Sequence, residues 1–98
     1  DLVLTNINLN VTTYFDEVNG NSYFSGEIFM IKGNEKIVIP MPFRYGYGTQ
    51  YMHEAKAILT EFNYISAEYG QGLERYCRDN DIIIGVDVKE VLTEQEML

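Results

Sequence analysis

Apolar and polar residues alternate over a long stretch near the start of this chain, in residues 2–17. One parity carries Val3, Ile7, Leu9, Val11 and Phe15, and the other carries Asn6, Asn8, Asn10, Thr12 and Tyr14. A period of two belongs to a β-strand, whose successive side chains point to opposite faces of a sheet. The alternation therefore predicts a long strand with one buried face and one wetter face.

A hairpin is predicted directly after this strand. Asn19-Gly20 is a strong signal for a two-residue type I′ turn, because both residues tolerate positive φ. With that loop, apolar residues meet across the two strands: Phe15 opposite Phe24, Val11 opposite Ile28 and Leu9 opposite Met30, with Thr13 opposite Gly26. A slip of one residue would mix the two faces, so we expect this register.

A second turn within residues 32–36 leads into a third strand. A two-residue loop there, either Gly33-Asn34 or Asn34-Glu35, places Ile37, Ile39, Met41 and Phe43 on the core face. Pro40 and Pro42 share the other parity and lack amide donors, which is typical of an edge strand. The first three strands are therefore expected to form an antiparallel meander with the third strand at its edge.

Helical periodicity begins after Thr49, which is a plausible N-cap. One stripe of the expected helix holds Tyr51, Ala55, Ile58, Leu59 and Phe62. Ser66 could cap a second helix, but Gly70 and Gly72 disfavour an early start, so we expect regular helix only from about Gln71 to Asp79.

The β-rich run Ile82–Val88 predicts a fourth strand beside the first, and residues 93–98 are expected to fray or form a short turn. We therefore expect residues 1–98 to form a single α+β domain. Its architecture would be an antiparallel β-meander of three strands plus a fourth C-terminal strand, packed on one face by one or two helices.

The chain is acidic, with fifteen Asp and Glu against seven Lys and Arg and a net charge of −8, and residues 50–98 hold ten of the acids. Affinity for nucleic-acid phosphates comes mainly from Lys and Arg, so direct nucleic-acid binding is disfavoured. A basic protein surface is a better electrostatic partner. The single cysteine, Cys77, cannot form an internal disulfide and favours a reducing compartment, and no apolar run is long enough to cross a membrane.

The sequence shows no convincing catalytic set. His53 and Glu54 begin like a zinc-protease helix, but Ala57 stands where the second metal ligand belongs. Cys77 falls in an apolar helical stripe, where cysteine usually acts as a small buried hydrophobe. We therefore expect a protein that is not an enzyme and has no cofactor or metal site.

The segment Pro42–Tyr51 concentrates tyrosine and glycine between the third strand and the first helix. Gly46-Tyr47-Gly48 matches only part of a phosphate loop, since a third glycine and a Lys-Ser/Thr pair are missing. Two interpretations stay open: Tyr45 and Tyr47 splay, one inward and one to solvent, or they form a recognition loop. For the second, the expected partner-binding residues are Arg44, Tyr45, Tyr47, Tyr51, Glu54 and Glu61.

The sheet face opposite the helices would carry Phe29, Ile31 and Val38, an apolar patch that a monomer rarely leaves uncovered. Either the C-terminal segment folds over it or another chain does, so a homodimer or a protein partner is expected there. The tyrosines and asparagines of this face could alternatively stack single-stranded nucleic acid, against which the charge argues.

Two separated motifs, residues 12–23 (TTYFDEVNGNSY) and residues 42–51 (PFRYGYGTQY), resemble a family of small proteins encoded by tailed bacteriophages and prophages. The resemblance covers roughly residues 12–60 and transfers no site. It implies a phage origin and a location in the host cytoplasm.

The resemblance and the acidic charge together suggest a non-enzymatic accessory protein that binds a basic surface of a host protein, such as an inhibitor of a defence or nucleic-acid-processing factor. One alternative is a module that binds a small ligand or single-stranded nucleic acid through Arg44, Tyr45 and Tyr47. Another is a self-associating structural or assembly protein.

Overall fold

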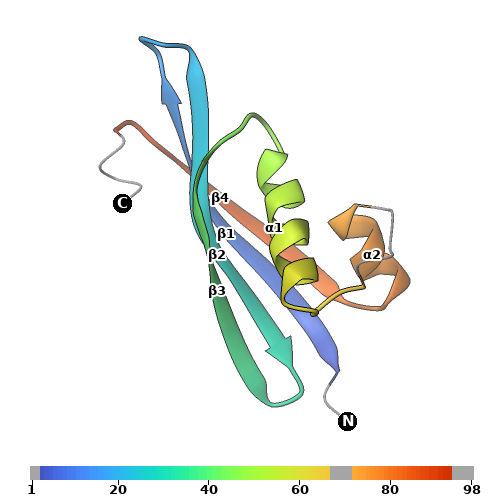
Figure 1. Ribbon diagram of the computed structural model, residues 1–98. Coiled ribbons are helices and arrows are strands. Elements are labelled where there is room, and N and C mark those ends of the chain that lie inside the picture. Colours follow the sequence, from blue (N-terminus) through green and yellow to red (C-terminus); the bar gives the residue numbers. More distant parts are fainter. Residues whose placement is uncertain (1–2, 67–71, 94–98) are drawn as a thin grey trace.

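The computed structural model describes residues 3–66 and 72–93 (Figure 1). Within these ranges the chain forms β1 (Leu4–Asp16), β2 (Asn21–Lys32), β3 (Glu35–Tyr45), α1 (Gln50–Glu61), α2 (Leu73–Asp79) and β4 (Ile83–Val91). Both helices lie on the same side of one sheet, which gives an α+β fold (Figure 1).

The strand order β3-β2-β1-β4 confirms the meander, the edge position of β3 and the placement of the fourth strand beside the first. However, β4 runs parallel to β1, so the sheet is mixed and not antiparallel throughout. A parallel neighbour needs a long crossover connection, and the segment that carries α1 and α2 supplies it by passing over one face of the sheet.

The predicted register of the first hairpin is wrong by two residues. Phe15 lies opposite Ser22 and not Phe24, Val11 lies opposite Gly26, and Leu9 lies opposite Ile28. The cause is a four-residue turn at residues 17–20, organised by Asp16. Its Oδ1 accepts the backbone amides of Val18 and Asn19 at 3.0 and 3.3 Å, and its Oδ2 accepts Asn19 Nδ2 at 2.8 Å.

Because the shift is an even number of residues, the side chains of residues 6–16 keep their predicted faces. A register irregularity between Leu4 and Asn6 breaks the pattern at the start of β1, where Leu4 packs against the core and Val3, predicted for the core face, is 60% exposed. The second turn has the expected two-residue loop, Gly33-Asn34, with Lys32 paired to Glu35.

The core lies between the sheet and the helices. Residues from β1, β2 and β3 meet residues from the helical layer there: Ile7, Leu9, Val11, Phe24, Ile28, Met30 and Met41 from the sheet, and Ala55, Ile58, Leu59, Ile65, Leu73, Cys77 and Ile82 from the crossover. Phe15 has the predicted parity but is 47% exposed, because the end of the first hairpin projects past α1 (Figure 1).

A bulge in β3 overturns the predicted position of Phe43. Phe24 pairs with Arg44 but Gly26 pairs with Met41, so β3 has one residue more than β2 between these pairs. Pro42 lies in this interval and has no amide donor for the ladder, which suits a bulge. The extra residue turns Phe43 away from the core and Arg44 toward the helical side.

Thr49 occupies the N-cap of α1, but its side chain makes no capping hydrogen bond. Ala55, Ile58 and Leu59 are buried as predicted, whereas Phe62 follows the end of the helix and is exposed. α2 begins at Leu73 with Gly72 as its N-cap, so Ser66 does not cap it. The predicted start at Gln71 and residues 94–98 of the predicted tail lie outside the described residues.

Candidate functional site

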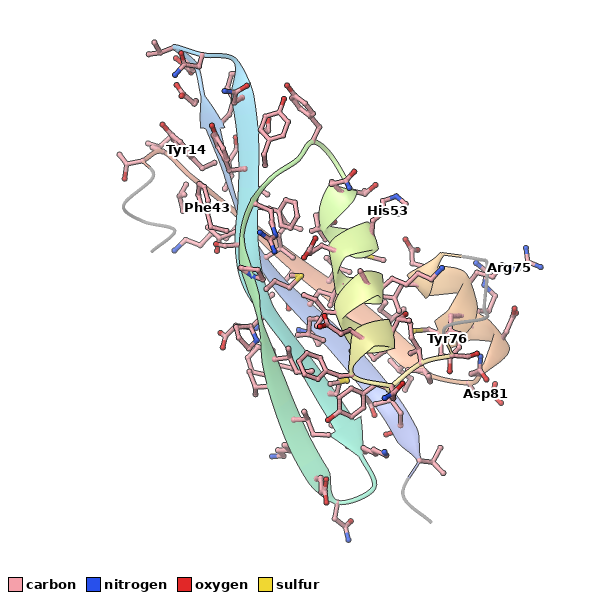
Figure 2. All side chains as sticks on the ribbon, in the orientation of Figure 1. Tyr14, Phe43, His53, Arg75, Tyr76 and Asp81 are labelled. Carbon is pink, nitrogen blue, oxygen red and sulfur yellow. The ribbon has the colours of Figure 1, made fainter. Side chains whose placement is uncertain are left out.

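An aromatic cluster extends from the sheet face that the helices leave uncovered to the loop before α1. It consists of Tyr14, Tyr23, Phe43, Tyr45 and Tyr47, which are called the tyrosine cluster below. Ring centroids are 6.2 Å apart for Tyr14–Tyr23, 5.0 Å for Tyr23–Phe43, 5.8 Å for Tyr23–Tyr45 and 5.5 Å for Tyr45–Tyr47. Figure 2 shows Tyr14 and Phe43 on the side of the sheet opposite the helices.

Strand register brings the cluster together. Tyr14 lies directly opposite Tyr23, and Tyr23 lies directly opposite Tyr45, so three neighbouring strands each contribute one tyrosine to the same row. The bulge in β3 adds Phe43, which stacks on Tyr23 with an angle of 18° between the rings. Stacked and edge-on aromatic pairs at these spacings attract each other beyond the area that they bury.

Tyr45 and Tyr47 neither splay inward and outward nor enter the core. Each is 55% exposed, and their hydroxyl oxygens are 2.8 Å apart in a hydrogen bond. This bond raises the pKa of Tyr45 above its ordinary value, with a smaller contribution from burial. The Tyr47 hydroxyl also donates to the Gly20 carbonyl at 3.4 Å, which ties the loop before α1 to the turn between β1 and β2.

Carboxylates border the cluster at the end of the sheet where Tyr14 lies. Tyr14 shares a shallow hollow of about 350 Å³ with Asp16 and Glu17. The hydrogen bond from the Asn19 side chain holds the pKa of Asp16 below its usual value, so this carboxyl is ionised at neutral pH. Aromatic faces beside carboxylates suit a cationic side chain, which can satisfy both kinds of group.

The six predicted partner-binding residues do not form one site. Tyr45 and Tyr47 belong to the tyrosine cluster, whereas Arg44 Nε lies 3.6 Å from Glu54 Oε1 on the helical side. Tyr51 is half-buried and meets Phe24 edge to face, with ring centroids 6.5 Å apart. Glu61 is exposed at the last position of α1.

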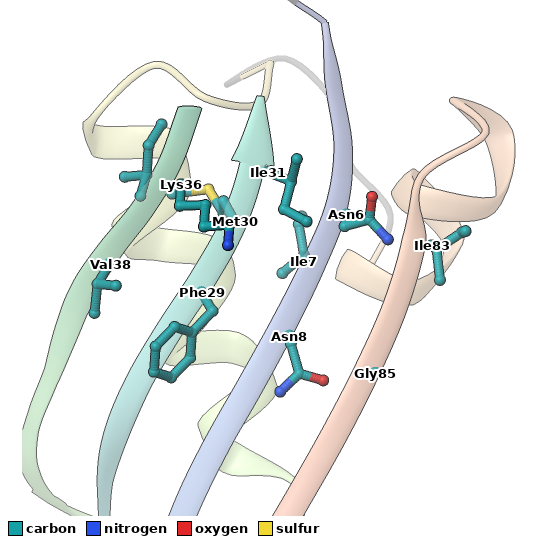
Figure 3. A pocket seen from close by; sticks show the side chains of 11 residues that line it. Asn6, Ile7, Asn8, Phe29, Met30, Ile31, Lys36, Val38, Ile83 and Gly85 are labelled. Atoms are coloured by element: carbon teal, nitrogen blue, oxygen red, sulfur yellow. The ribbon is translucent and has the colours of Figure 1, made fainter. Parts of the chain in front are cut away.

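The three residues predicted for self-association, Phe29, Ile31 and Val38, line a second feature of the uncovered face, called the open-face groove below. It has a volume of about 380 Å³, and Asn6, Asn8, Lys36 and Ile83 are also among its lining residues (Figure 3). Ile31 and Val38 are 39% and 49% exposed. The patch predicted from parity is therefore present and uncovered by the described residues.

Groups with catalytic or ligating potential are dispersed. In residues 3–66 and 72–93 no three His, Cys, Asp or Glu side chains are grouped as a metal site. His53 is exposed on α1, beside Met52 and Lys56 in another shallow hollow. Cys77 is fully buried, and burial, with a smaller effect of Glu74, raises its thiol pKa to about 11.

Two features of the glycine-rich loop disfavour an anion site. The Gln50 amide at the start of α1 donates to the Tyr47 carbonyl at 3.0 Å, and Arg44 is paired with Glu54 instead of the loop. Gly48 has a φ of +53°, so its role is to turn the backbone before α1. An added Cβ at Gly46 would lie 2.8 Å from a Phe24 ring carbon, so that glycine allows close packing.

Tyr14, Tyr23 and Phe43 were not among the predicted site residues. Tyr14 and Tyr23 are direct neighbours only in the observed hairpin register, which differs by two residues from the predicted one. Phe43 needs the bulge, for which Pro42 is the local sign.

Comparison of the chain with protein-family models, with curated proteins and with solved structures gives no match. Among the described residues, no helix has the length and apolar character needed to span a membrane.

Proposed function

We propose that this chain is a non-enzymatic accessory protein that binds a basic surface of another protein through the tyrosine cluster. The observation that carries the proposal is a row of stacked and edge-on rings from three neighbouring strands, on an uncovered face and beside carboxylates. Aromatic residues supply much of the binding energy at protein interfaces because they are large and lose little conformational entropy.

Charge supports a basic partner. The net charge of −8 attracts a cationic surface over the long range, and Asp16 and Glu17 lie beside Tyr14 for short-range pairing. Arginine fits best, because its guanidinium stacks on aromatic rings and forms forked hydrogen bonds with carboxylates.

The same argument weighs against single-stranded nucleic acid. Stacking platforms for nucleic acid need nearby cations to neutralise phosphates. Arg44 is paired with Glu54, and Lys32 lies 5.6 Å from the Tyr64 ring centroid. Lys89 lies on the same sheet face, beside Thr12, but the carboxylates of Asp16, Glu17 and Asp87 outnumber it at this end of the sheet.

The resemblance to phage-encoded proteins extends the proposal. In that setting the partner is a host protein in the host cytoplasm, and a defence or nucleic-acid-processing factor is a fitting target because such factors carry basic surfaces for nucleic acid. An acidic protein that occupies that surface would inhibit the factor by excluding its substrate.

Titration with synthetic peptides tests the binding chemistry. An arginine-rich peptide should change the tyrosine fluorescence of the protein and bind more weakly as salt increases, because salt screens the charges. A Tyr45→Ser and Tyr47→Ser double variant should lose most of this binding, whereas Phe62→Ser, which removes an exposed ring beyond α1, should retain it. Equal binding by all three proteins, or preferential binding of a glutamate-rich peptide or single-stranded oligonucleotide, would contradict the proposal.

A second candidate function, a self-associating assembly protein, is favoured by the open-face groove. Its apolar residues Ile31 and Val38 are exposed on a sheet face, where stacking against another sheet would bury them. Val38→Glu should then reduce self-association in sedimentation experiments while leaving arginine-peptide binding intact. Unchanged association by this variant would remove the groove as an assembly surface.

A further inference from the structure

The two edges of the sheet differ in their capacity to accept another strand. β3 carries Pro40 and Pro42, which lack amide donors and blunt that edge. β4 contains no proline in its nine residues and, in the described part of the chain, pairs only with β1. The outward amides and carbonyls of β4 are therefore suited to pairing with another extended strand.

Side chains on β4 restrict which strand would fit. Asp87 lies on the uncovered face, because its Oδ2 is 3.3 Å from Asn8 Nδ2. Lys89 is two residues farther along and so shares that face. Both are exposed, and Lys89 makes no ion pair among residues 3–66 and 72–93. Val88, between them, is 52% exposed on the other face.

A second copy of β4 can meet these requirements in an antiparallel pairing. A two-fold axis perpendicular to the sheet can leave the two uncovered faces on the same side of the joint sheet. The axis must then lie midway between the two copies of one residue of β4, because directly opposite residues share a face. An axis at Asp87 or at Lys89 sets like charges opposite each other, and an axis at Val86 places Lys89 opposite Ile83. An axis at Val88 places Asp87 of each copy opposite Lys89 of the other.

We propose that β4 pairs with β4 of a second copy about Val88, so that one continuous sheet spans a homodimer. Two Asp87–Lys89 pairs fix the register. The strand added to the edge of each sheet is therefore β4 of the other copy. This pairing leaves β3, with Phe43 and Tyr45, at the outer edges of the dimer. It is therefore independent of the proposed binding by the tyrosine cluster and of stacking through the open-face groove.

Charge reversal tests the register. Sedimentation velocity of the unchanged protein from micromolar to millimolar concentration should show a monomer–dimer equilibrium. Asp87→Lys and Lys89→Asp should each weaken the dimer by about tenfold or more, because each creates two like-charge pairs across the strands. Lys56→Glu, a charge reversal on α1 away from β4 and from the open-face groove, should leave the equilibrium unchanged.

Mixing the two variants provides the decisive measurement. In a heterodimer of Asp87→Lys with Lys89→Asp, every cross-strand pair again joins opposite charges, so native mass spectrometry should show the heterodimer in excess of either homodimer. Circular dichroism of each variant verifies that the fold is retained. A strict monomer at all concentrations, unaltered dimerisation by the single variants, loss of the dimer through Val38→Glu instead, or no preference for the heterodimer would each overturn the pairing.

Discussion

Gly26 marks the place where two strand backbones leave no room for a side chain. An added Cβ there would overlap the carbonyl oxygen of Asn10 and lie 3.0 Å from the Cα of Val11. The ladder holds these strands together, so they cannot separate locally without losing hydrogen bonds. We expect Gly26→Ala to lower the free energy of unfolding in urea by about 2–4 kcal/mol. Gly72→Ala, whose added Cβ would have nothing within 4 Å, should cost less than about 1 kcal/mol.

Tyr47 controls the ionisation of Tyr45 through the bond between their hydroxyl groups. Tyr47→Phe removes that bond, so the pKa of Tyr45 should fall toward its ordinary value. Ultraviolet difference titration or tyrosine ring NMR can follow this change. Tyr64→Phe, on the helical side, should leave the Tyr45 titration unchanged, and an equal shift from both variants would show that the hydroxyl pair is not its cause.

Cys77 links folding stability to alkaline pH. Burial raises its thiol pKa from 9.0 to about 11, so the folded state disfavours the thiolate. This contribution is complete below pH 9.0 and is lost as pH rises through about 11. Unfolding free energy should therefore fall over this window by up to about 2–3 kcal/mol more than in Cys77→Ala. Identical slopes for the two proteins would contradict this assignment.

At the scale of elements, the turn between β1 and β2 depends on the ionised carboxylate of Asp16. Asp16→Ala should accelerate amide exchange at Val18 and Asn19, which lose their acceptor. The pKa of Asp16 is lowered from 3.8, so its contribution is complete above pH 3.8 and disappears as pH falls through the lower folded value. Exchange measured under native conditions, with amides of the second turn as the reference, would show the effect at residues 17–20 alone.

The sequence predicts the approximate bounds and the buried faces of most strands and helices, but it predicts less of how the strands pair. Alternation and helical periodicity identify the faces of β1 and α1, since burial follows the pattern of side chains along one element. The hairpin register could not be predicted, because hydrogen bonds to a single side chain, Asp16, hold a four-residue turn in place of the expected two-residue turn. The local sequence of β4 does not show that it runs parallel to β1, because the length and path of the crossover determine the strand direction.

The candidate site likewise combines residues that the sequence predicts with contacts that it does not predict. Tyr45 and Tyr47 can be predicted from local composition alone. Phe29, Ile31 and Val38 can be predicted from the parity of residues along their strands. The tyrosine cluster itself depends on contacts between strands distant in sequence, and the bulge at Pro42 turns Phe43 into it. The ion pair between Arg44 and Glu54 likewise depends on the position of α1 over β3, which the local sequence does not show.

For the whole molecule, the net charge of −8 opposes compaction while favouring a basic partner. Added salt screens both effects, so it should raise the melting temperature of the free protein and weaken its binding of an arginine-rich peptide. A melting curve and a titration at the same salt concentrations provide the two measurements. Opposite or absent trends would show that charge governs neither property.

The parallel pairing of β1 with β4 also sets the order in which the nascent chain can complete its fold. The first three strands can associate through short turns as soon as they leave the ribosome, whereas β1 lacks its second neighbour until residues 83–91 have been synthesised. During that interval the edge of β1 is open to other chains. Translation speed across the helical crossover therefore governs how long that vulnerability lasts.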